Sequence, residues 1–392
     1  MVPKGWEKNS LDSLFEFKNG LNTEKEQYGN GYKFVNVMDV FRNDILTESK
    51  IIGRVQVTDK QLEGYQLKYG DVLFNRTSET FDEIAIAAIY LDNAIATFGG
   101  FVIRARPKGN QIDPAYSVFL FQSKNYRSQV VKLGQGAIRA NIGQKDLARV
   151  CILVPPLAEQ KKIAQILSTW DKAISVTEKL LTYSQQQKKA LMQQLLTGKK
   201  RLLDENGVRF NGKWEKKLLS DVADVYQPKT ISQSMMSDSG YPVYGANGVI
   251  GFYQEFNHET EQIAVTCRGS TCGIVNWTQA KSWITGNAMV INTDNYSYVS
   301  KKFLFYTLNG SDLKYLISGS GQPQITGNIK THIINLPCIE EQQKIATVLS
   351  AADAEIYTLE KKLACLRDEK KALMQQLLTG KRRVKVDEAV AE

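Results

Sequence analysis

Hydrophobic residues recur at helical spacing along two long stretches of the chain. Between Pro156 and Gly198, and again between Pro337 and Gly380, no proline or glycine interrupts the pattern. The apolar positions follow one another at steps of three, four and seven residues, a stripe typical of an amphipathic α-helix. Proline before the start and glycine after the end are common helix boundaries. We therefore predict two long helices, each on the order of 60 Å at a rise of about 1.5 Å per residue.

The two predicted helices carry a repeated sequence. Residues 188–199 return letter for letter as residues 370–381, at an offset of 182 positions. The match extends back without a gap to Glu159-Gln160 and Glu341-Gln342. This period is far longer than a solenoid unit, so it indicates a duplicated half-molecule. Neither helix can bury its stripe alone, and we expect the two to pack as a coiled coil; two separate helices, each lying on its own domain, are the alternative.

The segment before the first helix alternates short apolar runs with polar turn residues. Its β-branched and aromatic runs predict strands: 32–37, 71–74, 84–90 and 101–104. Residues 114–131 carry apolar side chains at helical spacing and predict a helix.

The segment between the two helices follows the same plan. Residues 212–216 echo residues 5–8 around a Trp-Glu-Lys sequence. Residues 262–266 predict a strand, and residues 301–309 predict a helix. A polar, glycine-containing loop precedes the last strand in both segments, at residues 134–145 and 319–330.

These patterns predict an α+β protein with a pseudo-two-fold, duplicated plan. Two similar domains of mixed helix and strand are joined by two long helices packed as a coiled coil. The expected divisions are a first domain, the central helix, a second domain, the C-terminal helix and a tail: 1–155, 156–202, 203–336, 337–383 and 384–392.

Charge adds one indication to this picture. The net charge is +9, and residues 156–202 alone carry nine Lys or Arg against three Asp or Glu. Residues 203–336 are neutral, with eleven of each sign. A basic balance allows a nucleic-acid partner, while a solvated basic helix face explains the charge equally well.

The spacing of the cysteines and the length of the apolar runs indicate the cellular compartment. The five cysteines show no disulfide-framework spacing, which favours the reducing cytoplasm. Apolar runs such as residues 84–89 are too short to cross a bilayer, and residues 1–6 do not form a signal peptide. We expect a cytoplasmic protein without a membrane partner.

Candidate catalytic motifs fail on inspection. Residues 197–200 resemble the end of a phosphate-binding loop but lack the upstream glycine and the hydroxyl after the lysine. In residues 113–116, Ala115 replaces the second proline of an adenine-methyltransferase box. Only two histidines exist, and neither cysteines nor carboxylates cluster at metal-ligand spacing. We expect no catalytic residues and no metal site in this chain.

The repeated segments identify a family resemblance. Residues 155–164 and 337–346, together with the two Leu-Leu-Thr-Gly-Lys helix endings, resemble the specificity (S) subunit of type I restriction–modification enzymes. The resemblance covers the whole chain. It implies two target-recognition domains, 1–155 and 203–336, each followed by a conserved long helix, with the helices packed antiparallel. Each domain would read one half of a bipartite, asymmetric target in double-stranded DNA.

The same resemblance implies partners and the location of cofactors. Two methyltransferase (M) subunits would flank this chain and carry S-adenosylmethionine. Restriction (R) subunits would supply ATP-driven and magnesium-dependent cleavage. The chain itself would bind no cofactor, and its helices would set the spacer between half-sites and dock the M subunits.

Polar loops supply the candidate DNA-contacting residues. Arg, Asn and Gln side chains can read base edges, and Lys and Arg can contact phosphates. Any one of these side chains could instead be a solvated loop residue. The candidates are Asn75, Arg76, Arg139, Asn141 and Lys145 in the first domain, and Tyr244, Asn247, Arg268, Gln322, Gln324, Asn328 and Lys330 in the second.

Two other function classes fit parts of the pattern. A tethering protein would carry two protein-binding heads on a coiled coil, and the neutral second domain favours it, because sequence-independent DNA affinity depends on cations. A solitary methyltransferase would bind S-adenosylmethionine by itself. A lack of salt-sensitive DNA binding, even with partners present, would favour the tethering protein. Binding of S-adenosylmethionine by the isolated chain would favour the methyltransferase.

Overall fold

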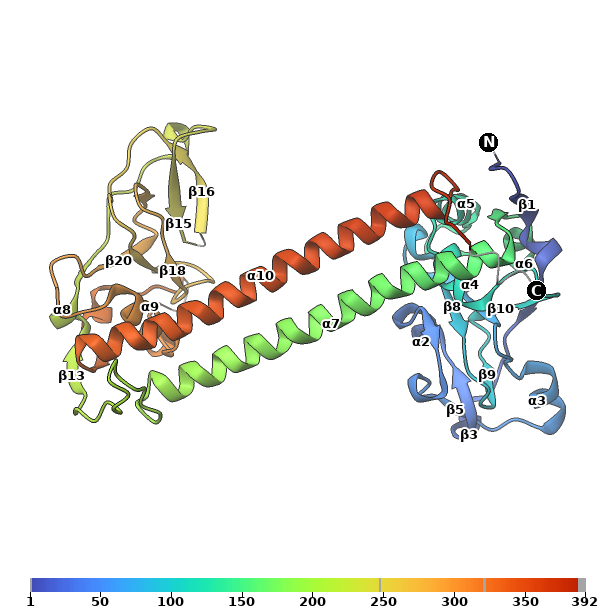
Figure 1. The fold of residues 1–392 in the computed structure, drawn as a ribbon, viewed down its shortest axis with the longest axis horizontal. Coiled ribbons are helices and arrows are strands. Elements are labelled where there is room, and N and C mark those ends of the chain that lie inside the picture. Colours follow the sequence, from blue (N-terminus) through green and yellow to red (C-terminus); the bar gives the residue numbers. More distant parts are fainter. Residues whose placement is uncertain (1, 247, 320–321, 387–392) are drawn as a thin grey trace. The chain divides into compact units, whose positions relative to one another are not determined.

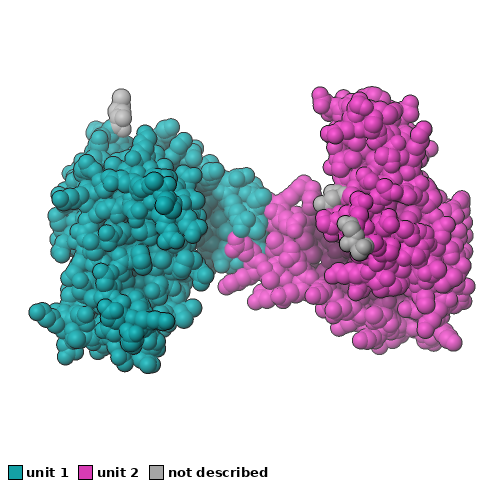
Figure 2. Space-filling model, turned by 180° about the vertical axis from the view of Figure 1, so that it is seen from behind, with its two compact units in different colours: residues 1–177, 362–392 teal, residues 178–361 magenta. Residues whose placement is uncertain are grey.

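The structure forms two compact units, which Figure 2 shows in different colours. Unit 1 contains Met1–Thr177 and Lys362–Glu392, and unit 2 contains Glu178–Lys361. Each unit combines one globular block with one half of each long helix. A computed structural model (Figure 1) describes residues 2–246, 248–319 and 322–386.

The described part of the block in unit 1 contains twelve short strands. They are β1 (Glu7–Ser10), β2 (Phe15–Asn19), β3 (Tyr28–Val35), β4 (Ile45–Leu46), β5 (Arg54–Val55), β6 (Val72–Asn75), β7 (Thr77–Ser78), β8 (Ala87–Tyr90), β9 (Ala96–Phe98), β10 (Val102–Pro107), β11 (Ala140–Asn141) and β12 (Cys151–Val154). The main sheet has the order β2-β10-β6-β8-β4, and a second sheet has the order β5-β3-β9. The pairs β1-β12 and β11-β7 complete the set.

The core of unit 1 follows from its most apolar strand. β6 is buried along its whole length, which suits a strand covered on both faces. Helices around the sheet add aromatic rings, and Phe74 meets Phe121 edge to face with ring centroids 5.1 Å apart. The helices of the block are α1 (Leu11–Leu14), α2 (Val37–Arg42), α3 (Asp59–Tyr65), α4 (Pro114–Leu120), α5 (Lys124–Leu133) and α6 (Gln144–Ala148).

Two sequence predictions in this block need correction. Residues 114–131 form α4 and α5 rather than one helix, because the Ser123 side chain accepts a hydrogen bond from Tyr126 N and starts a new helix. The strand predicted at 84–90 begins only at Ala87, because Ala85 adopts a left-handed backbone with φ 51°. The strands expected near 32–37, 71–74 and 101–104 are confirmed.

Unit 2 repeats this plan with shorter sheets. Its strands and helices are β13 (Glu215–Leu218), α8 (Leu219–Val222), β14 (Asp224–Tyr226), β15 (Tyr241–Gly245), β16 (Gly248–Tyr253), β17 (Ile263–Thr266), β18 (Val275–Trp277), β19 (Trp283–Ile284), β20 (Ala288–Asn292), α9 (Lys301–Asn309) and β21 (Ile333–Leu336). The sheet β14-β20-β17-β18 corresponds to β2-β10-β6-β8, and β16-β15-β19 corresponds to β5-β3-β9. The predicted strand at 262–266 and the helix at 301–309 are confirmed.

The two long helices are as the hydrophobic stripe predicted. α7 spans Leu157–Leu195 and α10 spans Ile339–Leu377, each of 39 residues. They run side by side and antiparallel: in unit 1 Lys370 pairs with Asp171, and in unit 2 Lys188 pairs with Asp353. The two ion pairs are related by the repeat. The predicted coiled coil of antiparallel helices is therefore confirmed.

The same Glu-Gln pair stands at the start of both long helices, and the contacts of the glutamine explain why this pair is identical in the two repeats. Gln160 accepts a hydrogen bond from Asp113 N at 2.8 Å, and Gln342 accepts one from Ser300 N at 2.8 Å. Both glutamines are fully buried. Each therefore fixes the start of its long helix to the globular block that precedes it.

A three-part clamp repeats beside these glutamines. In unit 1, Glu159 accepts hydrogen bonds from Trp6 Nε1 at 3.0 Å and from Arg383 at 2.8 Å. In unit 2, Glu341 accepts them from Trp214 Nε1 at 3.1 Å and from Arg201 at 2.6 Å. Each clamp joins the segment after one long helix, the start of the other long helix and the residue just before the first strand of a block.

Candidate nucleic-acid interface

In unit 1 the two polar loops expected to contact DNA lie together. We call residues 75–78 and 134–142 loop pair 1. β7 pairs with β11, which places Asn141 opposite Thr77, and Ile142 N donates to Arg76 O at 3.0 Å. Arg76, Arg139 and Asn141 are all exposed on this pair. The structure thus brings three of the five candidate residues of this domain into one surface.

Asn75 has a different place in loop pair 1. Its side chain is fully buried, donates to Glu83 O at 2.9 Å and to Thr77 O at 3.2 Å, and accepts from Ile86 N at 2.6 Å. These bonds use both ends of the amide, so Asn75 holds the loop in shape. Lys145 is exposed on α6, just after the loop pair.

Unit 2 contains the matching arrangement, loop pair 2, formed by residues 267–273, 318–319 and 322–325. A backbone bridge joins Arg268 to Gln324, and Gly269 N donates to Pro323 O at 3.0 Å. Arg268, Gln322 and Gln324 are all exposed. Side chains more than fifty positions apart in the sequence therefore share one surface.

The remaining candidates of unit 2 serve the fold or lie apart from loop pair 2. Tyr244 is 7% exposed, and its hydroxyl accepts from Gln279 N at 3.1 Å. Asn328 lies within the 3-10 turn η6 (Gly327–Thr331), donates to Leu316 O at 2.8 Å and accepts from Thr326 N at 3.1 Å. The same turn presents the exposed Lys330. Asn247 lies outside the described residues.

Loop pairs 1 and 2 are equivalent positions of the two blocks. Each begins where the central strand of the main sheet ends, at β6 or β17, and pairs with the segment before the last strand, β12 or β21. Ile142 N bonds to Arg76 O as Ile325 N bonds to Cys267 O. The backbone plan is shared, but Thr77 and Asn141 stand where the second block has Arg268 and Gln324.

Burial disfavours the charged form of three titratable side chains of unit 2. Burial raises the pKa of the Cys267 thiol, beneath loop pair 2. Burial also lowers the pKa of His258 and of His332, which hydrogen-bond to Tyr226 and Tyr315. Within residues 2–246, 248–319 and 322–386, no three His, Cys, Asp or Glu side chains gather in a group that could hold a metal ion.

Each unit also has a groove along the end of a long helix. The grooves have volumes of about 860 Å³ in unit 1 and about 880 Å³ in unit 2. Seven side chains of each helix end are identical between the two grooves and combine lysines with apolar and amide groups. They are Lys188, Lys189, Met192, Gln193, Leu196, Thr197 and Lys199 in unit 2, and Lys370, Lys371, Met374, Gln375, Leu378, Thr379 and Lys381 in unit 1.

Among the described helices, none is both long and apolar enough to cross a lipid bilayer. Both long helices place charged residues along their exposed faces.

Comparison with known proteins agrees with this geometry. A family model described as the type I restriction modification DNA specificity domain matches residues 3–182 and 211–365. A Methanocaldococcus jannaschii protein named as the MjaX type I restriction enzyme specificity subunit is 28% identical, covering 98% of this chain and 95% of the relative. The MjaVIII specificity subunit of the same organism is 25% identical, covering 72% of this chain and 74% of the relative.

Solved structures show the same fold. The crystal structure of the S subunit of a type I restriction–modification system from M. genitalium matches with a TM-score of 0.63 at 16% identity, covering 96% of each chain. The HsdS subunit from Thermoanaerobacter tengcongensis matches with a TM-score of 0.50 at 18% identity, covering 97% of this chain and 98% of that chain. With two matched domains and this fold, the chain belongs to the type I restriction–modification DNA specificity family.

Proposed function

We propose that this chain is the non-catalytic subunit that selects the DNA target of a type I complex. Each globular block would read one half of a bipartite, asymmetric sequence. The observation that carries this proposal is the equivalence of loop pairs 1 and 2, which share a backbone plan but present different exposed side chains. Two similar readers with different surfaces suit two different half-sites.

Loop pair 2 has the chemistry for reading bases. Arginine can bind guanine O6 and N7 with two hydrogen bonds, and glutamine can bind adenine N6 and N7. The exposed Arg268, Gln322 and Gln324 supply both kinds of group. We propose that they contact base edges of one half-site, while Arg76, Arg139 and Asn141 contact the other.

The long helices would set the spacing and dock partners. A helix of 39 residues extends about 58 Å at 1.5 Å per residue. Its regular backbone hydrogen bonds keep this length fixed. The two grooves at their ends carry the same seven side chains, which favours two copies of one partner. We propose that methyltransferase subunits dock there. Restriction subunits would join the assembly, and S-adenosylmethionine, ATP and magnesium would bind to the partner subunits.

The proposed compartment is the cytoplasm, where the cellular DNA target is accessible. The five free cysteines are compatible with its reducing conditions.

Mapping methylated adenine tests the proposal. The chain is expressed with its methyltransferase subunit in a host that lacks DNA methylation, and modified bases are located by sequencing. We expect one asymmetric motif with two short defined halves and a fixed gap. Exchanging residues 203–336 for the corresponding block of another specificity subunit should change one half only. A soluble complex that methylates no defined motif would contradict the proposal.

A tethering protein is the second candidate, favoured by the neutral charge of residues 203–336. It predicts that the chain shows no salt-sensitive DNA binding, even with its partners present. A measured fall in DNA affinity between 50 and 200 mM salt, as released counterions require, would exclude it.

A further inference from the structure

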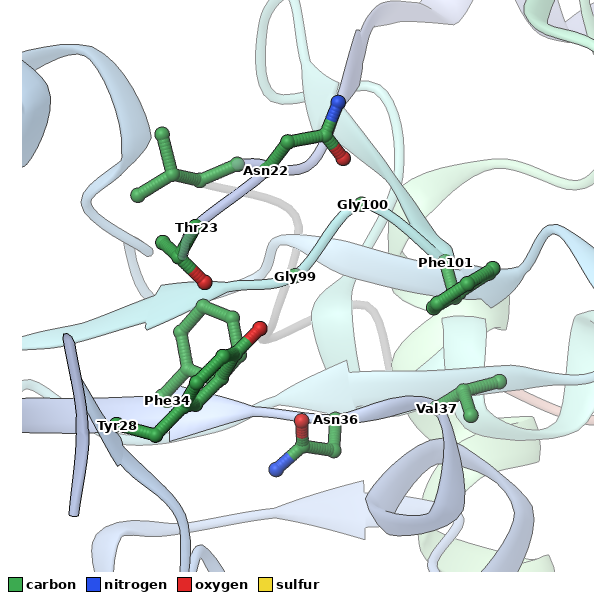
Figure 3. Close-up of a pocket in the computed structure, with 10 residues that line it drawn as sticks. Asn22, Thr23, Tyr28, Phe34, Asn36, Val37, Gly99, Gly100 and Phe101 are labelled. Atoms are coloured by element: carbon green, nitrogen blue, oxygen red, sulfur yellow. The ribbon is translucent and has the colours of Figure 1, made fainter. Parts of the chain in front are cut away.

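Unit 1 contains a pocket beside loop pair 1 that the proposed function has not used. Its volume is about 180 Å³ (Figure 3). Asn22 and Thr23 lie on one side of the Gly99–Gly100 segment, and Tyr28 and Asn36 lie on the other. Leu21, Phe34, Val37 and Phe101 complete the lining.

The pocket has a buried hydroxyl and an exposed amide on neighbouring residues. The Thr23 hydroxyl oxygen is buried and has no hydrogen-bond partner among the described residues. A buried hydroxyl without a hydrogen-bond partner is unfavourable, so it favours a ligand that can bond to it. Asn22 is exposed, and its amide oxygen lies so close to Gly100 that a Cβ there would come within 2.1 Å. Glycine at position 100 thus lets the amide lie directly over the backbone.

The remaining lining is apolar. Phe34 is buried, and its ring meets the Tyr28 ring edge to face with centroids 5.5 Å apart. Phe101 is 63% exposed at the rim. The pocket therefore pairs an aromatic surface with amide and hydroxyl donors. Of the four bases, thymine offers the matching edge in the major groove, an O4 acceptor next to a methyl group.

The pocket is continuous with loop pair 1. Arg76 N donates to Phe101 O at 2.9 Å, and Ile142 N donates to Arg76 O at 3.0 Å. A duplex read by Arg76 and Asn141 would therefore present a neighbouring base to Phe101 and Asn22.

We propose that this pocket receives the methyl-bearing edge of one thymine in the first half-site, with Asn22 and Phe101 as specificity-determining residues. The inference rests on the proposed function and adds to it a base and its readers. The 5-methyl group packs against Phe101 and the Tyr28–Phe34 pair. O4 accepts a hydrogen bond from the Asn22 amide.

Unit 2 treats the equivalent position differently. Cys267 N donates to Asn287 O as Arg76 N donates to Phe101 O, so Gly286 corresponds to Gly100. There the Gln227 side chain donates to Gly286 O. The amide that lies against the equivalent glycine is therefore Gln227 in unit 2 and Asn22 in unit 1, and we assign the thymine pocket to the first half-site.

Methylation mapping with two variants tests the pocket. Phe101→Ala and Asn22→Ala should each relax one thymine position of the first half, leaving the second half unchanged. Tyr69→Ala, another exposed aromatic of unit 1 at 56%, and Asn110→Ala are the matched controls and should leave the motif intact. Both variants alter exposed side chains, so folding should be preserved.

Removing the methyl group from DNA gives an independent measurement. Each thymine of the first half is replaced in turn by deoxyuridine, and binding by the complex with its methyltransferase subunit is measured. One replacement should weaken binding about fourfold, the effect of losing one buried methyl group, and the same replacement should have little effect on Phe101→Ala.

The outcomes separate the two proposals. If the wild-type complex gives no bipartite motif, the proposed function fails. If the wild type gives the motif but neither variant relaxes it, or if relaxation falls on a base other than thymine, only the pocket assignment is overturned.

Discussion

At the scale of single residues, candidate contacts divide into those that face solvent and those that shape a loop. Arg268 and Asn75 represent the two kinds. Arg268 is exposed on loop pair 2, whereas Asn75 is fully buried and bonded to three backbone groups. The two should respond to substitution in different measurements.

Replacing Arg268 should affect recognition of one half-site. We expect Arg268→Ala to weaken or relax reading of the second half by about 1–3 kcal/mol, the value of a good base contact. The first half should be unaffected. Arg209→Ala, which removes an exposed arginine of unit 2 outside the loop pair, is the control. Methylation mapping reads both halves at once, and an unaltered motif would remove Arg268 from the interface.

Replacing Asn75 should affect stability instead. Asn75→Ala leaves Ile86 N, Thr77 O and Glu83 O without their side-chain partners. We expect the free energy of unfolding to fall by about 2 kcal/mol, measured by urea denaturation. Asn110→Ala, at an exposed position, should change it by less than about 0.5 kcal/mol. Equal effects of the two substitutions would contradict the structural role of Asn75.

At the scale of elements, the sequence pattern predicts those helices and strands whose signals lie within the element itself. The stripe between Pro156 and Gly198 predicted α7, because helical spacing and boundary residues are local signals. The break at Ser123 was missed, since a side-chain cap competes with an unbroken apolar pattern. The Arg268–Gln324 bridge and the Asn22 pocket depend on strand pairing across distant segments, for which the chain carries no local signal.

The two helix ends offer a matched test of backbone and packing. Gly198 and Gly380 both have left-handed backbones, with φ of 70° and 67°. A Cβ at Gly198 would lie 3.6 Å from Trp214, an ordinary contact, whereas at Gly380 it would lie 2.4 Å from Pro3 Cγ.

Alanine at these glycines should therefore have unequal costs. Gly198→Ala should lower stability by about 1–2 kcal/mol from backbone strain alone. Gly380→Ala should cost more, because Pro3 must also move. Thermal unfolding of the two variants gives the comparison, and a larger loss for Gly198→Ala would show that the packing at Gly380 is misplaced.

At the scale of the whole molecule, duplication extends to what joins one repeat to the next. Glu159 and Glu341 each receive a tryptophan and an arginine, and the arginine always follows the long helix of the other repeat. Both carboxylates are buried, but the Arg383 side chain is 43% exposed and that of Arg201 only 20%.

The two clamps should therefore differ in strength. Glu341→Gln removes a charge from a more enclosed pair, and we expect it to lower the free energy of unfolding by about 3 kcal/mol. Glu159→Gln should cost less, because solvent screens Arg383. Denaturation of the two glutamate variants compares the clamps. Arg201→Ala, Glu341→Gln and their double variant together measure the coupling. Additive losses in the double variant would show that the pair does not interact.

Repetition of the clamp has a consequence for chain order. In unit 2 a connection through residues 199–213 joins α7 to Trp214. In unit 1 Arg383 donates to Lys4 O at 2.7 Å, and Gly380 lies against Pro3. A short linker from residue 383 to residue 4, with new ends opened at the exposed turn 205–207, should therefore give a circular permutant with the same fold and the same DNA target. The fold and the DNA target should therefore depend on the cyclic order of the two blocks and two long helices. The position of the chain ends within that order should not matter.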